Sequence, residues 1–551
     1  MRLDLRYLGR SEVTAAPGGG AALKFAPNLS RPRVAFDAEV RYPVRFREAI
    51  SALHDVVVHD LRFVKKDKAA YKAWKQQRQR REHQEAVMVQ QQRFDAELHE
   101  ALGKMSLRQP PQGLVETFQA YHARYWKVRR EWARELIRDD MEMFRHLVPC
   151  DPVVTVAPDT VYFECFAKDE SSYGCLFVDR GAFHDEQGGT ATGTTNVDYS
   201  LALYQHFQTL RSYRPTRLQV DPSGFEVQVE SRGGYREEKI DLPASWLRGF
   251  GQLQAAMCLP SRAVRLQVEA VYSVLAWLER HREKRGPRCI RFELTPGEAP
   301  ELVLEPWGKT IRCHGAAYRG ERRETIKVWG RRRLTSLTRV LPLTDHVEVL
   351  LLGSGLPSVW IAHMDEMRFV LGLSGWTTNS WTGAAALDQL AGDLKVSPQV
   401  VARLERHLRE AQLATLGELE AACVGEPRSS VLGSLHQLAR RGQIVYDFVT
   451  SRYRYRQVMP YALSADLLGP EPPEVVASRE LLGEVTLEVN TRKGDAQRLK
   501  GRVGGTSCEA TLDGAGRFVK ARCSCSFFYK NTLRQGPCRH LMALKAVGRE
   551  L

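Results

Sequence analysis

Apolar positions change their period several times along the 551-residue chain, and each change predicts a different kind of element. Residues 1–60 begin with apolar and polar positions that alternate, followed by a short helical pattern, so we expect a β-rich N-terminal segment. Residues 61–148 are rich in strong helix formers, broken at Pro110 and Pro111. Apolar positions three or four apart then resume, which predicts a helical hairpin.

Strand-like segments dominate the middle of the chain. Residues 149–260 mix short apolar runs with two helical patterns, which predicts a mixed α/β region. Residues 261–384 contain one helical pattern and then strand-like runs at regular spacing, which predicts a β-rich region with an antiparallel sheet or small barrel.

Residues 385–460 have the element order of a winged helix, with three helical segments followed by a strand hairpin. Thr415 and Glu418 are spaced as a capping box, which predicts where the second helix begins. Winged helices either bind DNA through the third helix and the hairpin or make protein contacts, and the pattern leaves both functions open. Three arginines here are candidate nucleic-acid contacts: Arg428, Arg452 and Arg454.

The chain ends in a small module. Residues 461–480 contain several prolines and predict a linker. Residues 481–551 begin with alternating strands separated by glycines and end in a strand and a short helix. The whole pattern therefore predicts an α+β multidomain protein with a helical hairpin, mixed α/β and antiparallel β regions, a winged-helix-like segment and a C-terminal module.

Four metal-ligating side chains mark this module, in the pattern Cys523-x-Cys525-x12-Cys538-x-His540. Three thiolates and one imidazole are the ligand set of a closed tetrahedral Zn²⁺ site. We expect the first pair to lie at the end of a strand and the second in the first turn of a helix. Cys508 is expected to be a core residue rather than a fifth ligand. The spacing therefore predicts one structural Zn²⁺.

This motif, preceded by a strand hairpin, resembles the SWIM zinc finger, whose signature is C-x-C-xn-C-x-H. Segments further upstream, such as FECFAKDESSY and YDFVTSRYRYRQVMP, are similar to a family of bacterial proteins that end in a SWIM finger. Members of that family are often encoded beside MoxR-type AAA+ ATPases and von Willebrand A-domain proteins. The resemblance implies the same four zinc ligands, DNA or protein binding, and partners of these kinds, but no catalytic residue.

The charge of the chain adds a candidate ligand. Its formal net charge is +15 and its pI is about 9.3, and such a surface attracts nucleic acid. An arginine-rich proteome would give the same charge without that function. Near the metal motif the basic residues outnumber the acidic ones, and five are candidate nucleic-acid contacts: Lys520, Arg522, Lys530, Arg534 and Arg539.

The first helix of the predicted hairpin is also basic. It carries ten Lys or Arg residues between Arg62 and Arg93, opposed by three carboxylates. One interpretation is an arm that binds nucleic acid or an acidic protein. The other is an ordinary helix face that is exposed to solvent.

Several classes of function are disfavoured. No apolar run is long enough to cross a membrane and the first residues do not read as a signal peptide, so we expect a cytoplasmic protein without membrane contact. Eleven scattered cysteines indicate reduced thiols rather than a disulfide framework. The phosphate-binding loop G-x-x-x-x-G-K-[ST] and the motifs G-x-S-x-G and H-E-x-x-H are absent, and the acidic residues form no convincing triad. We therefore expect no enzyme.

Together these patterns predict a non-enzymatic zinc-binding adaptor. It would bind nucleic acid, DNA in preference to RNA, through the finger and the winged helix, within an assembly that contains an AAA+ ATPase. One alternative is a scaffold that binds only proteins. A second is a metal-dependent nuclease or transposase-like enzyme.

Overall fold

The chain divides into two compact units, and every described residue belongs to the one formed by Met1–Arg62, Cys150–Phe225 and Lys239–Leu551. The computed structural model describes residues 12–16, 20–25, 34–58, 152–167, 171–186, 189–196, 204, 207–208, 210–213, 215–220, 244–257, 261–283, 288–353, 357–374, 381, 396–457, 473–494, 496–513, 516–533 and 536–550. The helical hairpin predicted for residues 61–148 lies outside these residues.

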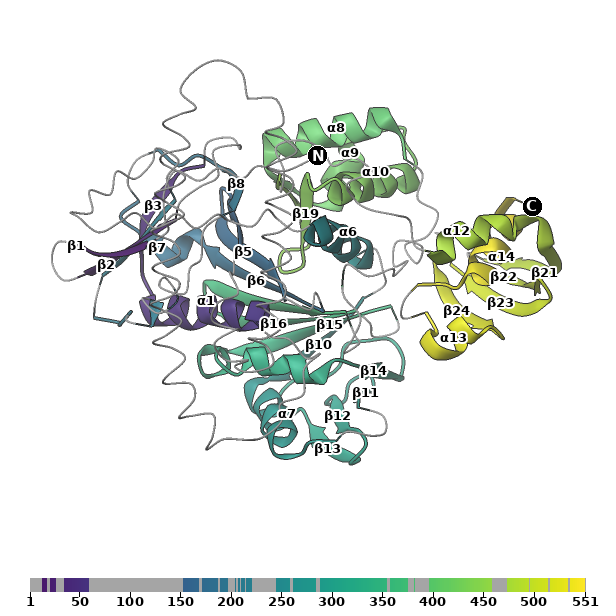
Figure 1. Ribbon diagram of the computed structural model, residues 1–551, viewed down its shortest axis with the longest axis horizontal. Helices are drawn as coiled ribbons and strands as arrows, with labels where there is room; N and C mark the ends of the chain where they lie inside the picture. Colours follow the sequence, from purple (N-terminus) through teal and green to yellow (C-terminus); the bar gives the residue numbers. More distant parts are fainter. Residues whose placement is uncertain are drawn as a thin grey trace, which may run out of the picture. The chain divides into compact units, whose positions relative to one another are not determined.

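An antiparallel sheet of eight strands, in the order β10-β15-β16-β17-β6-β5-β4-β8, is the centre of this unit (Figure 1). Its strands are β4 (Val153–Val156), β5 (Thr160–Phe166), β6 (Ser172–Asp179), β8 (Gly193–Asn196), β10 (Ser261–Gln267), β15 (His346–Leu352), β16 (Ser358–Met364) and β17 (Met367–Leu373).

Two helices cover opposite faces of this sheet: α1 (Pro43–Val58) and α6 (Ala244–Met257) (Figure 1). A Cβ atom at Gly174 of β6 would lie only 2.9 Å from Leu53 of α1, so Gly174 faces that helix. Its neighbour Tyr173 points to the other face and packs against Phe250 of α6. Both faces are covered, which is why β5 and β6 are buried at almost every position rather than at every second one.

The central sheet crosses the domain boundary that the sequence predicts at residue 260. Strands β4, β5, β6 and β8 come from residues 149–260, and β10, β15, β16 and β17 come from residues 261–384. The predicted division therefore has to be corrected to one sheet. The reason for the difference is physical: the apolar pattern of a strand shows which face is buried, but not which distant strand it pairs with.

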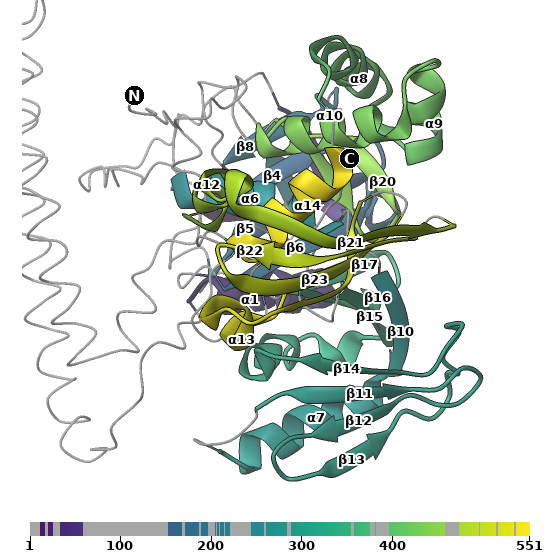
Figure 2. The same cartoon turned by 90° about the vertical axis from the view of Figure 1, so that its right-hand side faces the viewer.

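Two smaller sheets flank the central one. The first has the order β1-β2-β9-β3-β7 and uses strands from the predicted β-rich N-terminal segment. The second, in the order β13-β12-β11-β14, is antiparallel, and Figure 2 shows it with helix α7 (Val268–Arg280) beside β12 and β13. The strands are β1 (Glu12–Ala16), β2 (Gly20–Phe25), β3 (Phe36–Val40), β7 (Phe183–His184), β9 (Thr216–Val220), β11 (Ile290–Leu294), β12 (Glu301–Leu304), β13 (Lys309–Arg312) and β14 (Glu324–Val328).

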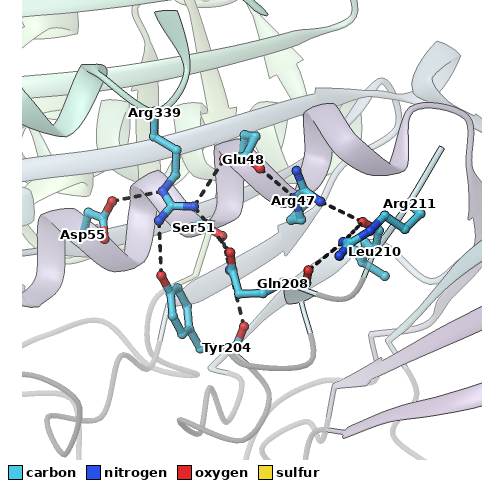
Figure 3. A network of polar contacts seen from close by, with 9 residues as sticks. All are labelled: Arg47, Glu48, Ser51, Asp55, Tyr204, Gln208, Leu210, Arg211 and Arg339. Atoms are coloured by element: carbon cyan, nitrogen blue, oxygen red, sulfur yellow. Dashed lines mark hydrogen bonds and ion pairs between the residues drawn. The ribbon is translucent and has the colours of Figure 1, made fainter. Parts of the chain in front are cut away.

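A network around Arg339 attaches α1 to the segment that follows the 3₁₀ helix η2 (Arg331–Leu337) (Figure 3). The Arg339 guanidinium donates to Glu48 at 3.2 Å and to Asp55 at 3.2 Å, two residues that lie about two turns apart on α1. A third donation reaches the hydroxyl of Tyr204 at 3.3 Å. One arginine therefore connects three segments that are far apart in the sequence.

Residues 396–457 form three helices and a small antiparallel sheet, in the order β18-β20-β19. Thr415 and Glu418 make both hydrogen bonds of the predicted capping box, so this prediction is confirmed. The elements are α8 (Pro398–Ala411), β18 (Leu413–Ala414), α9 (Leu416–Ala422), α10 (Arg428–Arg440), β19 (Ile444–Asp447) and β20 (Arg452–Tyr455).

Helix α10 is packed between other helices instead of facing solvent. It contacts α8 within this module and α6, the helix that covers one face of the central sheet. A Cβ atom at Gly251 of α6 would lie 3.3 Å from the Arg440 side chain and 3.5 Å from its Cα, so the two helix backbones approach closely. Most of α10 between Ser430 and Ala439 is buried, which leaves little of the helix to contact a ligand.

Two arginines near the end of the hairpin connect this module to strand β5 and to the residue that precedes it. Arg454 forms ion pairs with Asp159 at 2.5 Å and with Asp447 at 2.9 Å, and 2% of its side chain is exposed. Arg456 pairs with Glu164 at 2.7 Å, and both of these side chains are fully buried. The second carboxylate oxygen of Glu164 accepts a hydrogen bond from Tyr173 at 2.7 Å.

Replacing Asp159 with asparagine is expected to lower stability in a pH-dependent way. Burial acts to raise the pKa of Asp159, but the hydrogen bonds and charge of Arg454 outweigh it and hold that pKa below its ordinary value. A lowered pKa stabilises the fold above the unfolded-state pKa of about 4, and this contribution is lost as the pH falls through the folded-state pKa. Because 44% of the Asp159 side chain is exposed, we expect a loss of about 1 kcal/mol or less.

Urea unfolding of the parent and the Asp159→Asn variant at pH 7 and below pH 4 checks this expectation. The two proteins should differ at pH 7 and converge in acid. A difference that is independent of pH would show that the carboxylate charge is not what stabilises this contact.

The C-terminal module is an antiparallel meander, β21-β22-β23-β24, and Figure 2 shows its first three strands side by side. Helix α14 packs on β21, β22 and β23, and α12 packs on α14. The alternating strands predicted for residues 481–551 are present. The elements are α12 (Pro473–Glu480), β21 (Val485–Lys493), β22 (Ala496–Val503), β23 (Thr506–Leu512), β24 (Phe518–Cys523), α13 (Ser526–Asn531) and α14 (Arg539–Glu550).

Candidate metal centre and basic sheet face

The four predicted ligands lie together at one end of the C-terminal sheet. One ligand atom from each of Cys523, Cys525, Cys538 and His540 can be chosen so that all four lie within 4.8 Å of one another. A tetrahedral zinc site with Zn–S bonds of 2.3 Å needs sulfur–sulfur separations of about 3.8 Å. The described side chains therefore form a cluster of the right size for one ion.

Local structure explains how the two pairs converge. Cys523 is the last residue of β24, and Cys525 precedes helix α13, where its sulfur accepts a hydrogen bond from the backbone of Phe528 at 3.3 Å. Cys538 directly precedes α14, and its carbonyl accepts from the backbone N–H of Met542 at 3.1 Å. The predicted placement at a strand end and a helix start is confirmed.

The chemistry of the donors fits zinc. Among the described residues, the imidazole Nδ1 of His540 is buried and has no hydrogen-bond partner, which is costly for a polar atom unless a ligand satisfies it. Three cysteine sulfurs and one imidazole complete a set of four with no position left open. One structural Zn²⁺ therefore fits this site, held by Cys523, Cys525, Cys538 and His540. Bound there, it would connect the end of β24 to the start of α14.

A fifth sulfur lies next to the cluster. Cys508 pairs with Cys523 across β23 and β24, and the two Sγ atoms are 3.6 Å apart. Hydrogen bonds from the Cys508 and Cys538 thiols lower the pKa of the Cys523 thiol. Cys508 is buried among the apolar residues beneath α14 and is not one of the four clustered ligands. It is a core residue, as the sequence predicts.

Arg539, a predicted nucleic-acid contact, is engaged within the module. Its guanidinium donates to Glu474 of α12 at 2.6 Å, and its backbone N–H donates to the same carboxylate at 2.8 Å. Burial acts to raise the pKa of Glu474, but these bonds outweigh it and lower that pKa. Arg539 therefore joins α12 to the start of α14, and we leave it out of the proposed ligand surface.

Lys520 and Arg522 lie on the face of the sheet opposite the metal cluster. Residues directly opposite in an antiparallel pair share a face, and Cys508 pairs with Cys523 on the face covered by α14. The neighbouring pairs, Glu509 with Arg522 and Thr511 with Lys520, therefore point the other way. Both basic side chains are exposed, and neither forms an ion pair with any residue the structure describes.

Strand β22 adds three cations to this surface, because Arg498, Lys500 and Arg502 pair with the same outward positions of β23. We name this surface the outer sheet face and define it by its five cations: Arg498, Lys500, Arg502, Lys520 and Arg522. Two carboxylates accompany them: Glu509 lies 2.8 Å from Arg498, and Glu488 lies 2.9 Å from Lys500. Cations therefore outnumber carboxylates on this face.

Sequence reasoning missed the three cations of β22. The available signal was the segment AQRLKGRV, in which basic residues occupy every second position. A strand places such residues on one face, about 6.7 Å apart along the chain.

The remaining candidates are distributed as follows. Lys530 is exposed on α13, beside Tyr529 with 87% of its surface exposed, and Arg534 lies outside the described residues. Arg428 is exposed at the start of α10 and pairs with Glu420 at 3.0 Å. Arg452 is exposed in the hairpin, whereas Arg454 is buried between two carboxylates. Its charge is fully used inside the fold, so Arg454 has to be removed from the predicted contacts.

Comparison with known proteins identifies the C-terminal module. The family model described as SWIM zinc finger matches residues 507–547, which include all four clustered ligands. The chain therefore contains a C-terminal SWIM zinc finger. No curated protein matches the chain.

Among solved structures, the chain is similar to the Proliferating Cellular Nuclear Antigen from Entamoeba histolytica, with 11% identity and a TM-score of 0.32 over 62% of this chain and 98% of that one. It is also similar to the PCNA2-PCNA3 complex from Sulfolobus tokodaii, with 10% identity and a TM-score of 0.27 over 41% and 89% of the two chains. TM-scores this low do not establish a shared fold. None of the described helices is long and apolar enough to cross a membrane.

Proposed function

We propose that this protein binds nucleic acid through the outer sheet face of its SWIM module, with zinc holding that face in shape. The observation that carries the proposal is the convergence of five cations from β22 and β24 on one exposed face, accompanied by two carboxylates. Lysine and arginine side chains arranged in this way bind phosphate groups without reading the base sequence.

Zinc acts indirectly in this proposal. Cys523 directly follows Arg522, and Lys520 lies three residues before the metal ligand on the same strand. Fixing Cys523 to the start of α14 therefore fixes the strand that carries both cations. The ion itself, closed by four protein ligands, would not contact the nucleic acid.

The proposal predicts a large, salt-dependent loss of affinity in the variant Arg498→Gln/Arg502→Gln/Lys520→Gln. Each lost phosphate contact should reduce the slope of log affinity against log salt by about 0.7 for a single strand or 0.9 for a duplex, so three contacts reduce it by about 2 to 3. Fluorescence anisotropy with labelled 20-nucleotide single-stranded DNA, duplex DNA and RNA, across a salt series, measures the slope.

A matched control removes the same number of charges from the three-helix module: Arg403→Gln/Arg406→Gln/Arg428→Gln. All three of these arginines are exposed, and their loss should leave the slope unchanged. Zinc content of both variants should remain one ion per chain. If affinity falls in the control and not in the sheet variant, the ligand binds the three-helix module and the outer sheet face is not the site.

Three further parts of the functional hypothesis remain proposals. We propose that residues 385–460 are a winged helix, supported by the order of helices and strands in the described residues 396–457, but the burial of α10 disfavours DNA binding through that helix. We also propose that the protein is not an enzyme and that its partners include a MoxR-type AAA+ ATPase and a von Willebrand A-domain protein. The partner proposal rests on the family resemblance, and co-purification of the full chain with such an ATPase tests it.

A further inference from the structure

Three aromatic rings pack together where α7 ends beside the β12–β13 turn. The imidazole of His281 stacks on Trp277 with ring centroids 3.8 Å apart and planes 10° apart. Trp307 packs edge-on against both rings, with centroid separations of 6.4 Å and 6.0 Å. All three rings are partly exposed, so they form a surface rather than a closed core.

Two cations lie over the faces of the tryptophans. The Lys309 Nζ is 5.6 Å from the centre of the Trp277 ring, and the Arg331 guanidinium is 4.6 Å from the centre of the Trp307 ring. Arg331 is buried and also donates to the carbonyl of Glu305. These contacts hold the positive groups in fixed positions.

More arginines surround this centre. Arg331 and Arg332 open helix η2; the charge of Arg288 acts on both of them, and the charge of Arg282 acts on Arg332. Burial lowers the pKa of Arg332, and the charges of Arg288 and Arg282 lower it further. Burial likewise lowers the pKa of Arg331 to about 10; Cys289 and, less strongly, Glu283 oppose this, and repulsion from Arg288 and Arg332 adds to it.

Carboxylates only partly compensate for this charge. Glu283 acts on Arg331, as noted above, and has interactions of its own. Glu305 forms an ion pair with Arg291 at 3.2 Å. We name the group the tryptophan–arginine cluster and define it by its residues: Trp277, His281, Arg282, Arg288, Trp307, Lys309, Arg331 and Arg332. Among the described residues, the cluster brings five cations to one aromatic centre, whereas Glu283 and Glu305 are the carboxylates discussed above.

We propose that the tryptophan–arginine cluster is a second nucleic-acid contact surface, at which the arginines bind the phosphates of a strand. An arriving phosphate would relieve repulsion among arginines that the fold holds close together. The planar guanidinium offers paired N–H donors that match two phosphate oxygens, which makes arginine better suited than lysine to such a site.

The aromatic rings favour nucleic acid over an acidic peptide as the ligand. His281 and Lys309 already cover Trp277, so the partly exposed ring of Trp307 is the surface on which a base would stack, and a peptide of glutamates would make no use of it. The cluster belongs to α7, η2 and the β11–β14 sheet, whereas the outer sheet face belongs to residues 496–523. This inference therefore does not depend on the proposed function of the SWIM module.

The variant Arg282→Gln/Arg288→Gln/Arg332→Gln tests the proposal in the full chain. The probe is fluorescently labelled (dT)20, with its affinity measured across a salt series. We expect at least a tenfold loss of affinity at low salt and a slope reduced by about 2 for a single strand. The variant of the outer sheet face is measured in parallel, so that the effect of each surface on affinity is determined separately.

Competition experiments identify the ligand chemistry. Unlabelled (dT)20 should displace the probe, while poly-glutamate and inorganic phosphate at equal phosphate or carboxylate concentration should not. The single variant Lys309→Gln provides a second measurement with an exposed side chain, in case the triple variant does not fold. An unchanged slope in both variants overturns the proposal, and equal competition by poly-glutamate or by free phosphate overturns its assignment to nucleic acid.

Discussion

Replacing Cys538 with serine is expected to abolish zinc binding and unfold the C-terminal module, while the central sheet stays folded. Cys538 is completely buried and directly precedes the helix that covers the sheet, so its loss leaves three of the four clustered ligands and removes the sulfur at the start of that helix. The core beneath α14 is small. In zinc-finger peptides a structural zinc contributes roughly 10–16 kcal/mol of apparent binding free energy, which is also folding free energy. A module of this size would lose most of its stability with the ion.

Metal analysis and limited proteolysis measure this effect. The parent should hold one zinc per chain and the Cys538→Ser variant none, with new protease cleavage confined to residues 473–551. The matched control is Cys508→Ala, which removes a buried sulfur next to the cluster but no ligand. It should lose some stability, about 1–3 kcal/mol, and keep its zinc. A Cys538→Ser variant that is zinc-free but still resists protease would contradict a structural role for the ion.

Replacing Arg456 with alanine is expected to destabilise the protein by about 3–5 kcal/mol, because it leaves Glu164 buried without its cation. Neither side chain of this ion pair is exposed, and Arg456 also lies over the ring of Phe250 at 4.4 Å. Burial already raises the pKa of Glu164, and Arg456 is the main group that opposes this. Without Arg456 the carboxyl will take up a proton more readily, so the destabilisation should diminish as the pH is lowered.

Urea unfolding of three variants separates the charge from the packing. The double variant Glu164→Gln/Arg456→Met should recover most of the stability that Arg456→Ala loses, since no charge is then buried alone. Arg452→Ala, which replaces an exposed arginine four residues earlier in β20, should change stability by no more than about 0.5 kcal/mol. If the double variant is as unstable as Arg456→Ala, packing around the guanidinium rather than its charge stabilises this contact.

The metal site could be predicted from the sequence because its ligands are local. Cys523 and Cys525 are two residues apart, as are Cys538 and His540, and the alternation around them gives the strand and helix that present each pair. The capping box at Thr415 was predictable for the same reason. The central sheet was not, because its pairing joins strands on both sides of residue 260, and no local pattern encodes the partner of a strand.

The basic residues were predicted least well, and the reason is physical. The sequence does not show whether a charged side chain is buried. Arg452 and Arg454 are two residues apart on one strand, yet Arg454 is enclosed by Asp159 and Asp447 whereas Arg452 is exposed. The number of basic residues near the metal motif predicts Arg539 as a contact, yet Glu474 of α12 neutralises its charge. The same count omits Arg498, which lies on β22, on the face of the sheet opposite the ligands.

The pairing of β6 with β17 affects how this chain folds during synthesis. Val178 on β6 pairs with Met367 on β17, roughly 190 positions later. At a translation rate of about 5–20 residues per second, the ribosome needs roughly 10–40 s to reach the second strand after the first. Throughout that interval the backbone N–H and C=O groups on the β17 side of β6 have no native partner, and an unpaired edge of this kind is a template for wrong pairing with another chain. A nascent chain with this topology therefore depends on whatever shields β6 until β17 arrives.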